Sequence, residues 1–184
     1  NKIVVAGQDI YPGDILNDKD EHTFRRIQIR ECIMSHLQKE KQLFEKGIKV
    51  LSLFFIDSVE KYRVYDEAGE QALGEYAKIF EEEYNSVRND FLDLFQQDYN
   101  DYLRDTDLAT VHKGYMPVQY TEYLQRDDAY KVHAGYFSID KKGKSVDPAV
   151  KRGSEDSDDI SAYDLIMKDK ERLLSFEEPT RFLF

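Results

Sequence analysis

The chain has 184 residues and a formal net charge of -11, with 41% hydrophobic residues, 13 tyrosines and 11 phenylalanines. This size and aromatic content can supply the core of one ordinary domain, which excludes a disordered acidic polymer. The single cysteine, Cys32, cannot form an internal disulfide, which favours a reducing compartment. The sequence has no run of 18 apolar residues and no basic leader, so we expect a cytoplasmic protein without a membrane span.

Negative charge is concentrated in the middle of the chain. Residues 57 to 110 hold fifteen acidic and five basic side chains, whereas the flanking regions are close to neutral. A basic patch outside the middle region can therefore still contact phosphates. Net charge neither supports nor excludes a nucleic-acid partner.

The first half of the chain predicts short strands, a long helix and a buried strand. Residues 3 to 6 and 10 to 11 are strand candidates separated by a turn. Residues 22 to 46 form an amphipathic segment, and Gly47 stands where a left-handed helix end is expected. Residues 48 to 57 are too apolar for a strand with one wet face, which is typical of a parallel sheet covered by helices. This strand ends at Asp57 and Ser58.

A second helix is predicted from Ala68. Two shorter helices are expected near residues 99 to 103 and 118 to 125. The apolar stripe of the second helix follows a spacing of three or four residues. It comprises Leu73, Tyr76, Ala77, Phe80, Tyr84, Val87, Phe91 and Phe95.

The last third predicts a strand at residues 131 to 138 and a mobile loop at residues 140 to 159. A helix capped by Asp158 or Asp159 follows, and a final strand begins at Arg181. These elements indicate an α/β fold with a mostly parallel sheet. The apolar end of the chain suggests a piece of a longer polypeptide.

Local motifs for chemistry are weak. Gly143-Lys144-Ser145 resembles the end of a phosphate-binding loop, but it lacks the earlier glycine, and Pro148 opposes a following helix. The four histidines are far apart, so no metal site is expected. Cys32 is predicted to be a packed, inert thiol. No catalytic set is found.

Arg25, Arg26 and Arg30 form the one cationic cluster with a defined shape. Arg26 and Arg30 are four residues apart and share a helical face. Two interpretations stay open: the face contacts successive phosphates or acids of another domain, or the arginines pair with Glu31 and neighbouring acids on their own helix.

Most of the chain also resembles the restriction (Res) subunit of type III restriction-modification enzymes, in the second RecA-like domain of its superfamily 2 helicase motor. Each matching piece is short, and their order and number are what is specific. The pieces are residues 7–11 with 13–16, 24–31, 47–57, 74–84, 132–140 and 158–184.

The resemblance implies roles for three segments. Residues 51 to 58 correspond to the first strand and motif IV, residues 132 to 135 to motif IVa, and residues 173 to 184 to the approach to motif V. It implies DNA-backbone contacts by Ser58, His133 and Gly135. Arg25, Arg26 and Arg30 are further candidates.

The resemblance also implies what lies elsewhere in the parent protein. The parent binds ATP and Mg²⁺ between two RecA-like domains and cuts DNA together with a methyltransferase (modification) subunit. The Walker elements, the arginine finger and the nuclease site do not match any part of this chain, so the fragment alone is expected neither to hydrolyse ATP nor to cut DNA. Residues 58 to 131 are interpreted as an acidic helical insertion.

Two other functions stay open. The acidic aromatic region at residues 57 to 110 can serve as a protein-interaction module that docks the modification subunit or another domain. A stand-alone enzyme with a small-molecule substrate is disfavoured because no catalytic set is present.

Overall fold

The computed structural model describes residues 3–5, 8–10, 18–105, 117–139, 145–146 and 162–184. No helix within these ranges is both long enough and apolar enough to cross a membrane. The elements in chain order are β1 (Ile3–Val5), β2 (Gln8–Ile10), α1 (Asp18–Phe44), β3 (Ser52–Leu53), the 3-10 helix η1 (Val59–Lys61), β4 (Arg63–Tyr65), β5 (Gln71–Leu73), α2 (Glu75–Asp105), α3 (Pro117–Arg126), the 3-10 helix η3 (Ala129–Lys131), β6 (His133–Ala134), β7 (Ser138–Ile139), β8 (Ser145–Val146), α4 (Ala162–Leu173) and β9 (Phe182–Leu183).

A small parallel sheet of three strands stands at the centre of a mixed α/β fold. β9 lies between β3 and β6, and both neighbours run parallel to it. Phe182 is in register with Ser52 on one side and His133 on the other. The prediction of a parallel sheet is confirmed for these three segments. Three antiparallel pairs, β1–β2, β4–β5 and β7–β8, complete the described strands.

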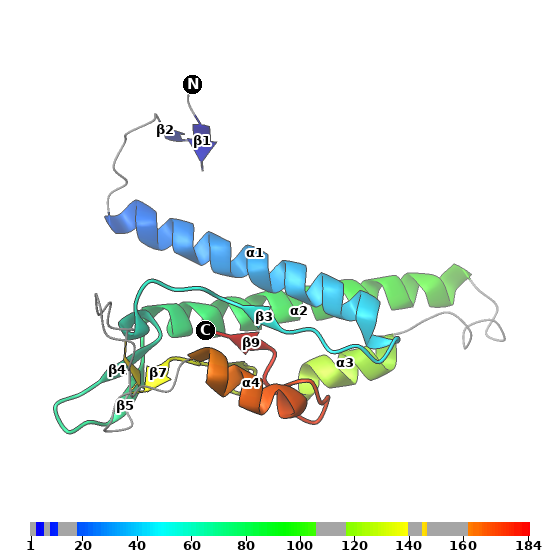
Figure 1. Cartoon of the computed structure of the whole chain (residues 1–184). Coiled ribbons are helices and arrows are strands. Elements are labelled where there is room, and N and C mark those ends of the chain that lie inside the picture. Colours follow the sequence, from blue (N-terminus) through cyan, green and yellow to red (C-terminus); the bar gives the residue numbers. More distant parts are fainter. Residues whose placement is uncertain (1–2, 6–7, 11–17, 106–116, 140–144, 147–161) are drawn as a thin grey trace.

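Aromatic rings fill the space between this sheet and the two long helices. Phe54 stacks on Phe184 with ring centroids 4.6 Å apart, and Phe80 of α2 lies 4.9 Å from Phe182. Such pairs add directional contacts to the burial of large apolar surfaces. Figure 1 shows α1 and α4 on opposite sides of β3 and β9, so helices cover the sheet from more than one side.

The first helix follows its sequence pattern closely. Ile29, Ile33 and Leu37 of α1 are buried. The helix ends at Phe44, and Gly47 has φ +67°, the left-handed conformation that glycine adopts without steric cost. The predicted helix and its glycine stop are confirmed.

The prediction that a second helix starts near Ala68 is wrong. Gly69 has φ +83° in a turn, and the flanking residues pair as the hairpin β4–β5, which includes Leu73. Helix α2 begins at Glu75, directly after Gly74, where a Cβ would lie 2.4 Å from the carbonyl oxygen of Glu60. Close packing against η1 therefore fixes the helix start, which an apolar repeat does not reveal.

Other boundaries also differ from the predictions. The predicted helix at residues 99 to 103 is part of α2, whereas the helix at 118 to 125 is confirmed as α3. The predicted strands at 48 to 57 and 131 to 138 shorten to two-residue pairings with β9. Of the predicted loop at residues 140 to 159, Ser145 and Val146 form β8 and the rest lies outside the described residues, as do the cap candidates Asp158 and Asp159.

Candidate nucleic-acid interface at the carboxyl ends of the strands

The carboxyl ends of the three parallel strands all lie toward one end of the molecule. In Figure 1, β3 runs from the end of α1 toward the hairpin β4–β5, and the N-terminal half of α1 lies at that same end. The carboxyl edge of an open parallel sheet is where ligands bind in many α/β folds. Ser58, His133 and Gly135 come from segments at or next to these strand ends, and the three arginines come from the N-terminal half of α1.

His133 is held by two side chains. Its Nδ1 lies 2.9 Å from the hydroxyl oxygen of Tyr62, and its Nε2 lies 3.2 Å from Oε1 of Glu81. A carboxylate can only accept, so the bond to Glu81 assigns the proton to Nε2. Nδ1 then accepts a hydrogen bond from the Tyr62 hydroxyl, and both ring nitrogens are occupied.

Burial decides the charge of this histidine. The His133 side chain is only 3% exposed, and removal from water lowers its pKa although Glu81 acts in the opposite direction. The ring is therefore neutral near pH 7. A neutral, buried imidazole with both nitrogens bonded is a structural bridge between η1, α2 and β6.

Gly135 has no side chain, and this leaves room for two aromatic rings. A Cβ at this position would lie 2.4 Å from a ring carbon of Tyr62 and 2.5 Å from one of Phe137. No side chain fits there unless both rings move. The position serves close packing over the end of β6.

Ser58 stabilises a local turn. It is the N-cap of η1, and its hydroxyl oxygen accepts a hydrogen bond from the backbone N–H of Glu60 at 3.2 Å. This is the ordinary function of serine at a helix start. The cap positions η1, which carries Val59 and leads into Tyr62 above the strand ends.

Arg26 and Arg30 pair with acids of α2. Arg26 contacts Glu82 at 2.6 Å and Glu83 at 2.7 Å. Arg30 contacts Glu83 and Asp90, each at 2.9 Å. These contacts join two helices of the same chain, an arrangement that neither sequence interpretation included. We call this set the α1–α2 ladder.

The ladder changes the protonation equilibria of its members. Burial alone raises the pKa of Glu83, but hydrogen bonds from Arg30 and Arg26 more than offset it, so the pKa lies below its ordinary value. Arg25 lies outside the ladder and contacts Gln28 at 3.1 Å and Glu21 at 3.7 Å on its own helix. A DNA contact by Arg26 or Arg30 would compete with these ion pairs.

Sequence reasoning missed a buried ionic cluster on the other half of α1. Arg181 is fully buried, and its Nη1 donates to Oε2 of Glu40 at 3.1 Å, while its Nη2 donates to the Tyr84 hydroxyl. The guanidinium also lies 4.9 Å from the ring centroid of Tyr123. The Tyr120 hydroxyl donates to the same Glu40 oxygen at 3.1 Å. We call these residues the Arg181 cluster.

Glu40 is ionised inside this cluster. Its burial raises its pKa, but nearby His36, Arg181 and the Tyr120 hydroxyl more than offset this, so the pKa lies below its usual value. His36 extends the cluster toward the sheet, since its Nδ1 lies 2.8 Å from the Ser52 hydroxyl. The available signal in the sequence was an acid and a histidine at core positions of an otherwise apolar helix stripe.

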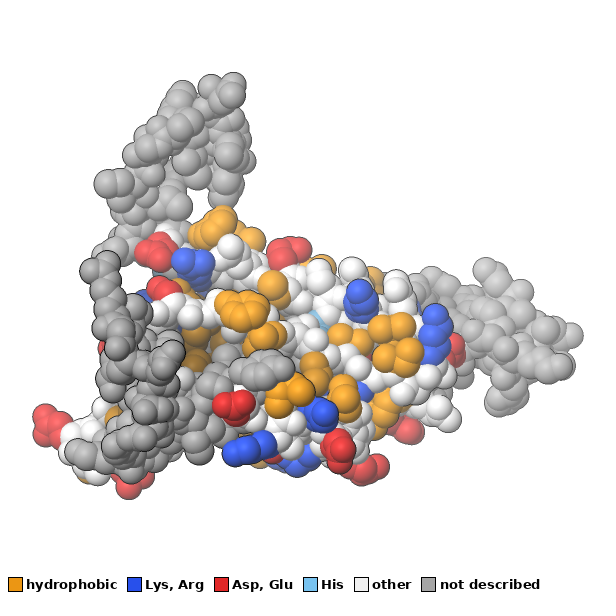
Figure 2. Space-filling view, in the orientation of Figure 1, with side chains coloured by type: hydrophobic (Ala, Val, Ile, Leu, Met, Phe, Trp, Pro, Cys, Tyr) orange, Lys and Arg blue, Asp and Glu red, His pale blue; other side chains and the backbone are white. Residues whose placement is uncertain are grey.

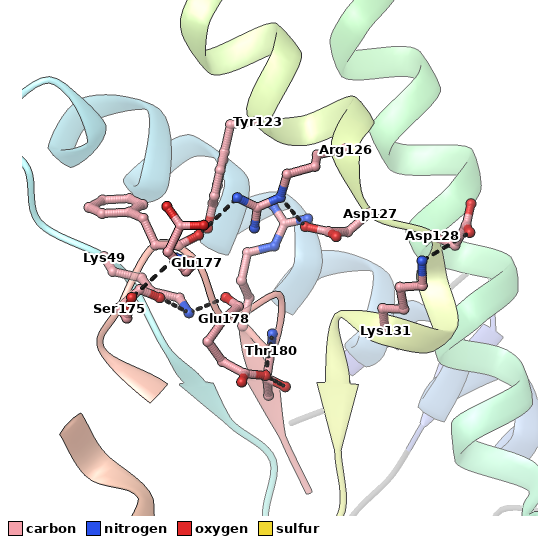
Figure 3. A network of polar contacts seen from close by, with 12 residues as sticks. Lys49, Tyr123, Arg126, Asp127, Asp128, Lys131, Ser175, Glu177, Glu178 and Thr180 are labelled. Carbon is pink, nitrogen blue, oxygen red and sulfur yellow. Dashed lines mark hydrogen bonds and ion pairs between the residues drawn. The ribbon is translucent and has the colours of Figure 1, made fainter. Parts of the chain in front are cut away.

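A second polar network closes the end of α4. Lys49 donates from Nζ to the carbonyl oxygens of Ser175 at 2.8 Å and Glu178 at 2.6 Å, and Figure 3 shows the ammonium between them. Arg126 donates to the carbonyl oxygen of Phe176 at 2.9 Å. Burial lowers the pKa of Lys49 to about 8, although Glu178 opposes this shift. These carbonyl groups belong to the turn that follows α4, so the two cations hold this turn against residue 49 and α3.

Two further predictions can be compared with the structure. Cys32 is exposed, so the prediction of a packed thiol is wrong, because residue 32 falls beside the buried stripe of α1 rather than within it. Partial desolvation and the charge of Glu31 raise its pKa, which disfavours the reactive thiolate. Ser145 starts strand β8 and accepts a hydrogen bond from Arg63, which differs from the helix start that a phosphate-binding loop requires.

Comparisons with known proteins do not identify a family for this chain. No family model, no curated protein and no solved structure matches the chain. The side chains predicted to contact DNA are, where described, engaged in contacts within the chain: a cap, a buried bridge, a packing position and ion pairs. The arrangement can position the strand ends rigidly.

Proposed function

We propose that the chain is the first part of the second RecA-like lobe in the restriction subunit of a type III restriction-modification enzyme. The observation that carries the proposal is the parallel pairing of β3, β9 and β6, the three segments that the resemblance assigns to motif IV, the approach to motif V and motif IVa. The shared direction of the strands is additional support, because it places their carboxyl ends at one edge, where open α/β sheets bind ligands.

In this proposal the chain supplies a rigid wall to the motor. ATP and Mg²⁺ bind to elements elsewhere in the parent protein, at the junction with the first RecA-like domain. DNA crosses both lobes, and the modification subunit is a partner of the parent protein. Ser58, His133 and Gly135 stabilise the protein backbone at the strand ends, and the α1–α2 ladder stabilises the packing of the lobe. Direct DNA contact by Arg25, Arg26 and Arg30 stays a prediction.

The proposal is tested on the full parent protein with its modification subunit. We expect ATP hydrolysis that DNA stimulates, and we expect the coding sequence after Phe184 to continue into a Gly-Trp-Asp motif. A parent protein whose ATP hydrolysis does not respond to DNA contradicts the proposal.

The role of the arginines is tested separately in the same protein. Arg26→Ala with Arg30→Ala should weaken the lobe but leave the salt dependence of DNA binding unchanged if their charges serve the ladder. A salt slope that falls by about one for each arginine removed would instead assign them to phosphate contacts.

A protein-interaction module remains the second candidate function. The hairpin β4–β5 carries exposed acids at its turn, including Glu67 and Glu70, next to an acidic helix. Deleting residues 66 to 110 would not test this, because α2 supplies the fully buried Phe80 and Tyr84. Reversing the charges of Glu67 and Glu70 leaves these core residues in place. Loss of assembly with the modification subunit at intact ATPase activity would favour docking.

A further inference from the structure

Strand β3 is an edge strand with an unpaired side. Backbone N–H groups of Ser52 and Phe54 donate to carbonyl oxygens of Arg181 and Leu183 in the segment of β9, at 2.9 and 2.7 Å. Backbone groups alternate in direction along a strand, so those of the odd-numbered residues between 51 and 55 face away from β9. In the described part of the chain no strand pairs with this side. Unpaired edges of this kind recruit further strands.

The unpaired side opens into a groove beside α1. The groove has a volume of about 500 Å³ and lies between one flank of α1 and the strand. Its lining residues are Glu31, Cys32, Ser35, His36 and Lys39 on the helix and Val50 to Phe54 on the strand. Apolar side chains also remain in water here: Phe55 is 92% exposed and Leu53 is 46% exposed. Figure 2 shows hydrophobic side chains across the middle of the face that contains β3 in Figure 1.

The helix flank of the groove carries opposite charges at its two ends. Glu31, Ser35 and Lys39 follow each other at intervals of four residues, so they share one line along α1. Glu31 and Lys39 are separated by about 12 Å along the axis and cannot pair with each other. Neither makes an ion pair to any other described residue. The small side chain of Ser35 lies midway between them.

This pattern is self-complementary. A two-fold axis through the middle of the groove would bring Glu31 opposite Lys39 of a second copy, and Lys39 opposite Glu31 of that copy. We propose that β3 pairs antiparallel with β3 of a second copy of this chain, which joins the two three-stranded sheets and places the two α1 helices side by side. This interface is independent of the proposed motor function.

The strand geometry agrees with the same axis. If Leu53 faces Leu53 of the second copy, then Leu51 faces Phe55, and all these positions have backbone groups directed to the open edge. The exposed Phe55 ring then covers apolar surface of the other copy. An interface that repeats the same patch on both copies is the commonest form of protein self-association. An unrelated extended peptide would satisfy the strand edge but would not require opposite charges placed symmetrically about Ser35.

Charge exchange tests the interface in solution. We expect the chain to form a concentration-dependent dimer by analytical ultracentrifugation. Glu31→Lys and Lys39→Glu should each weaken it by about tenfold or more, since each creates two like-charge contacts. Mixing the two single variants, or combining both changes in one chain, should restore dimer affinity. Lys46→Glu, an exposed change just after α1 and outside the groove, is the matched control and should have no effect.

A proline tests the strand edge itself. Leu53→Pro removes an N–H that faces the open edge, so it should abolish the dimer and leave the internal sheet paired. Circular dichroism and thermal unfolding check that the variant is folded. A chain that is monomeric throughout the concentration series overturns the proposal. So does a dimer that survives Leu53→Pro in a folded chain, or a monomer that binds an extended peptide in the groove without self-association.

Discussion

Helix α1 makes ion pairs in two very different surroundings. At its N-terminal half, Arg26 and Arg30 pair with α2 across a surface where both arginine side chains are about one third exposed. At its C-terminal half, Glu40 pairs with Arg181, and both side chains are 0% exposed. The residue types and bond distances are similar. The two sets differ in how much hydrating water their ions have lost.

This difference determines what each set of ion pairs can do. Exposed pairs contribute little because water and salt screen them. A buried pair compensates for the large cost of removing its ions from water, so it contributes little net stability but becomes essential once formed. The Arg181 cluster therefore fixes how α1, α2, α3 and β9 meet, whereas the ladder adjusts the packing of two helices.

The largest expected effect is loss of one partner in the buried cluster. Arg181→Met should destabilise the fold by about 3–5 kcal/mol because Glu40 is left as an uncompensated buried charge. Urea unfolding followed by circular dichroism measures the change. Combining it with Glu40→Leu should recover part of the loss, because the double variant leaves no orphan ion. A double variant that is as unstable as the sum of the two single variants would contradict this account.

Lys49 sharpens the comparison because it is buried against carbonyl groups rather than against a carboxylate. Its pKa in the folded chain is about 8, below the ordinary lysine value of 10.5. Between these values the unfolded chain holds more protons, so stability rises with pH. From pH 7 to 9 we expect a gain of about 1 kcal/mol that is absent from Lys49→Met. Equal pH profiles for the two proteins would show that the ammonium is not desolvated.

The two halves of α1 also show what the sequence could predict. The helix, its glycine stop and the buried Ile29, Ile33 and Leu37 follow from spacing alone, because period and end signals are local. The parallel sheet formed by β3, β6 and β9 was expected from the apolar strand segments and from the resemblance. The start of α2 was missed because Gly74 is set by its contact with η1, far from any helical repeat.

The candidate site was less predictable than the fold. His133, Gly135 and Ser58 were expected at the strand ends. The hydrogen-bond partners of His133, Tyr62 and Glu81, come from a different part of the chain, and Tyr62 also packs against Gly135. Arg181 looked like the beginning of a strand, and its burial depends on Glu40, which is 141 residues away in sequence. Pairings of this length carry no local signal. Only the polar positions in the core stripe of α1 indicated that something must balance them.

A smaller effect is expected in the α1–α2 ladder. Arg26→Ala together with Arg30→Ala should reduce the unfolding free energy by about 1 kcal/mol at low salt, because water screens most of their attraction to Glu82, Glu83 and Asp90. Unfolding at increasing NaCl concentration checks the cause, since the difference from the wild-type chain should shrink as salt rises. A difference that does not depend on salt would assign the loss to packing of the arginine stems.

The smallest effect is expected at Arg25, which serves as an internal control for the ladder. Its contacts are with Glu21 and Gln28 on the same helix, and its nearest carboxylate is 3.7 Å away. Such an i, i+4 pair stabilises a helix by about 0.3 kcal/mol, so Arg25→Ala should be nearly neutral in urea unfolding. If Arg25→Ala costs as much as removing Arg26 and Arg30 together, then contacts across helices contribute no more than contacts within one. In that case, the contrast between the two halves of α1 would come from burial alone and not from which helices the ion pairs join.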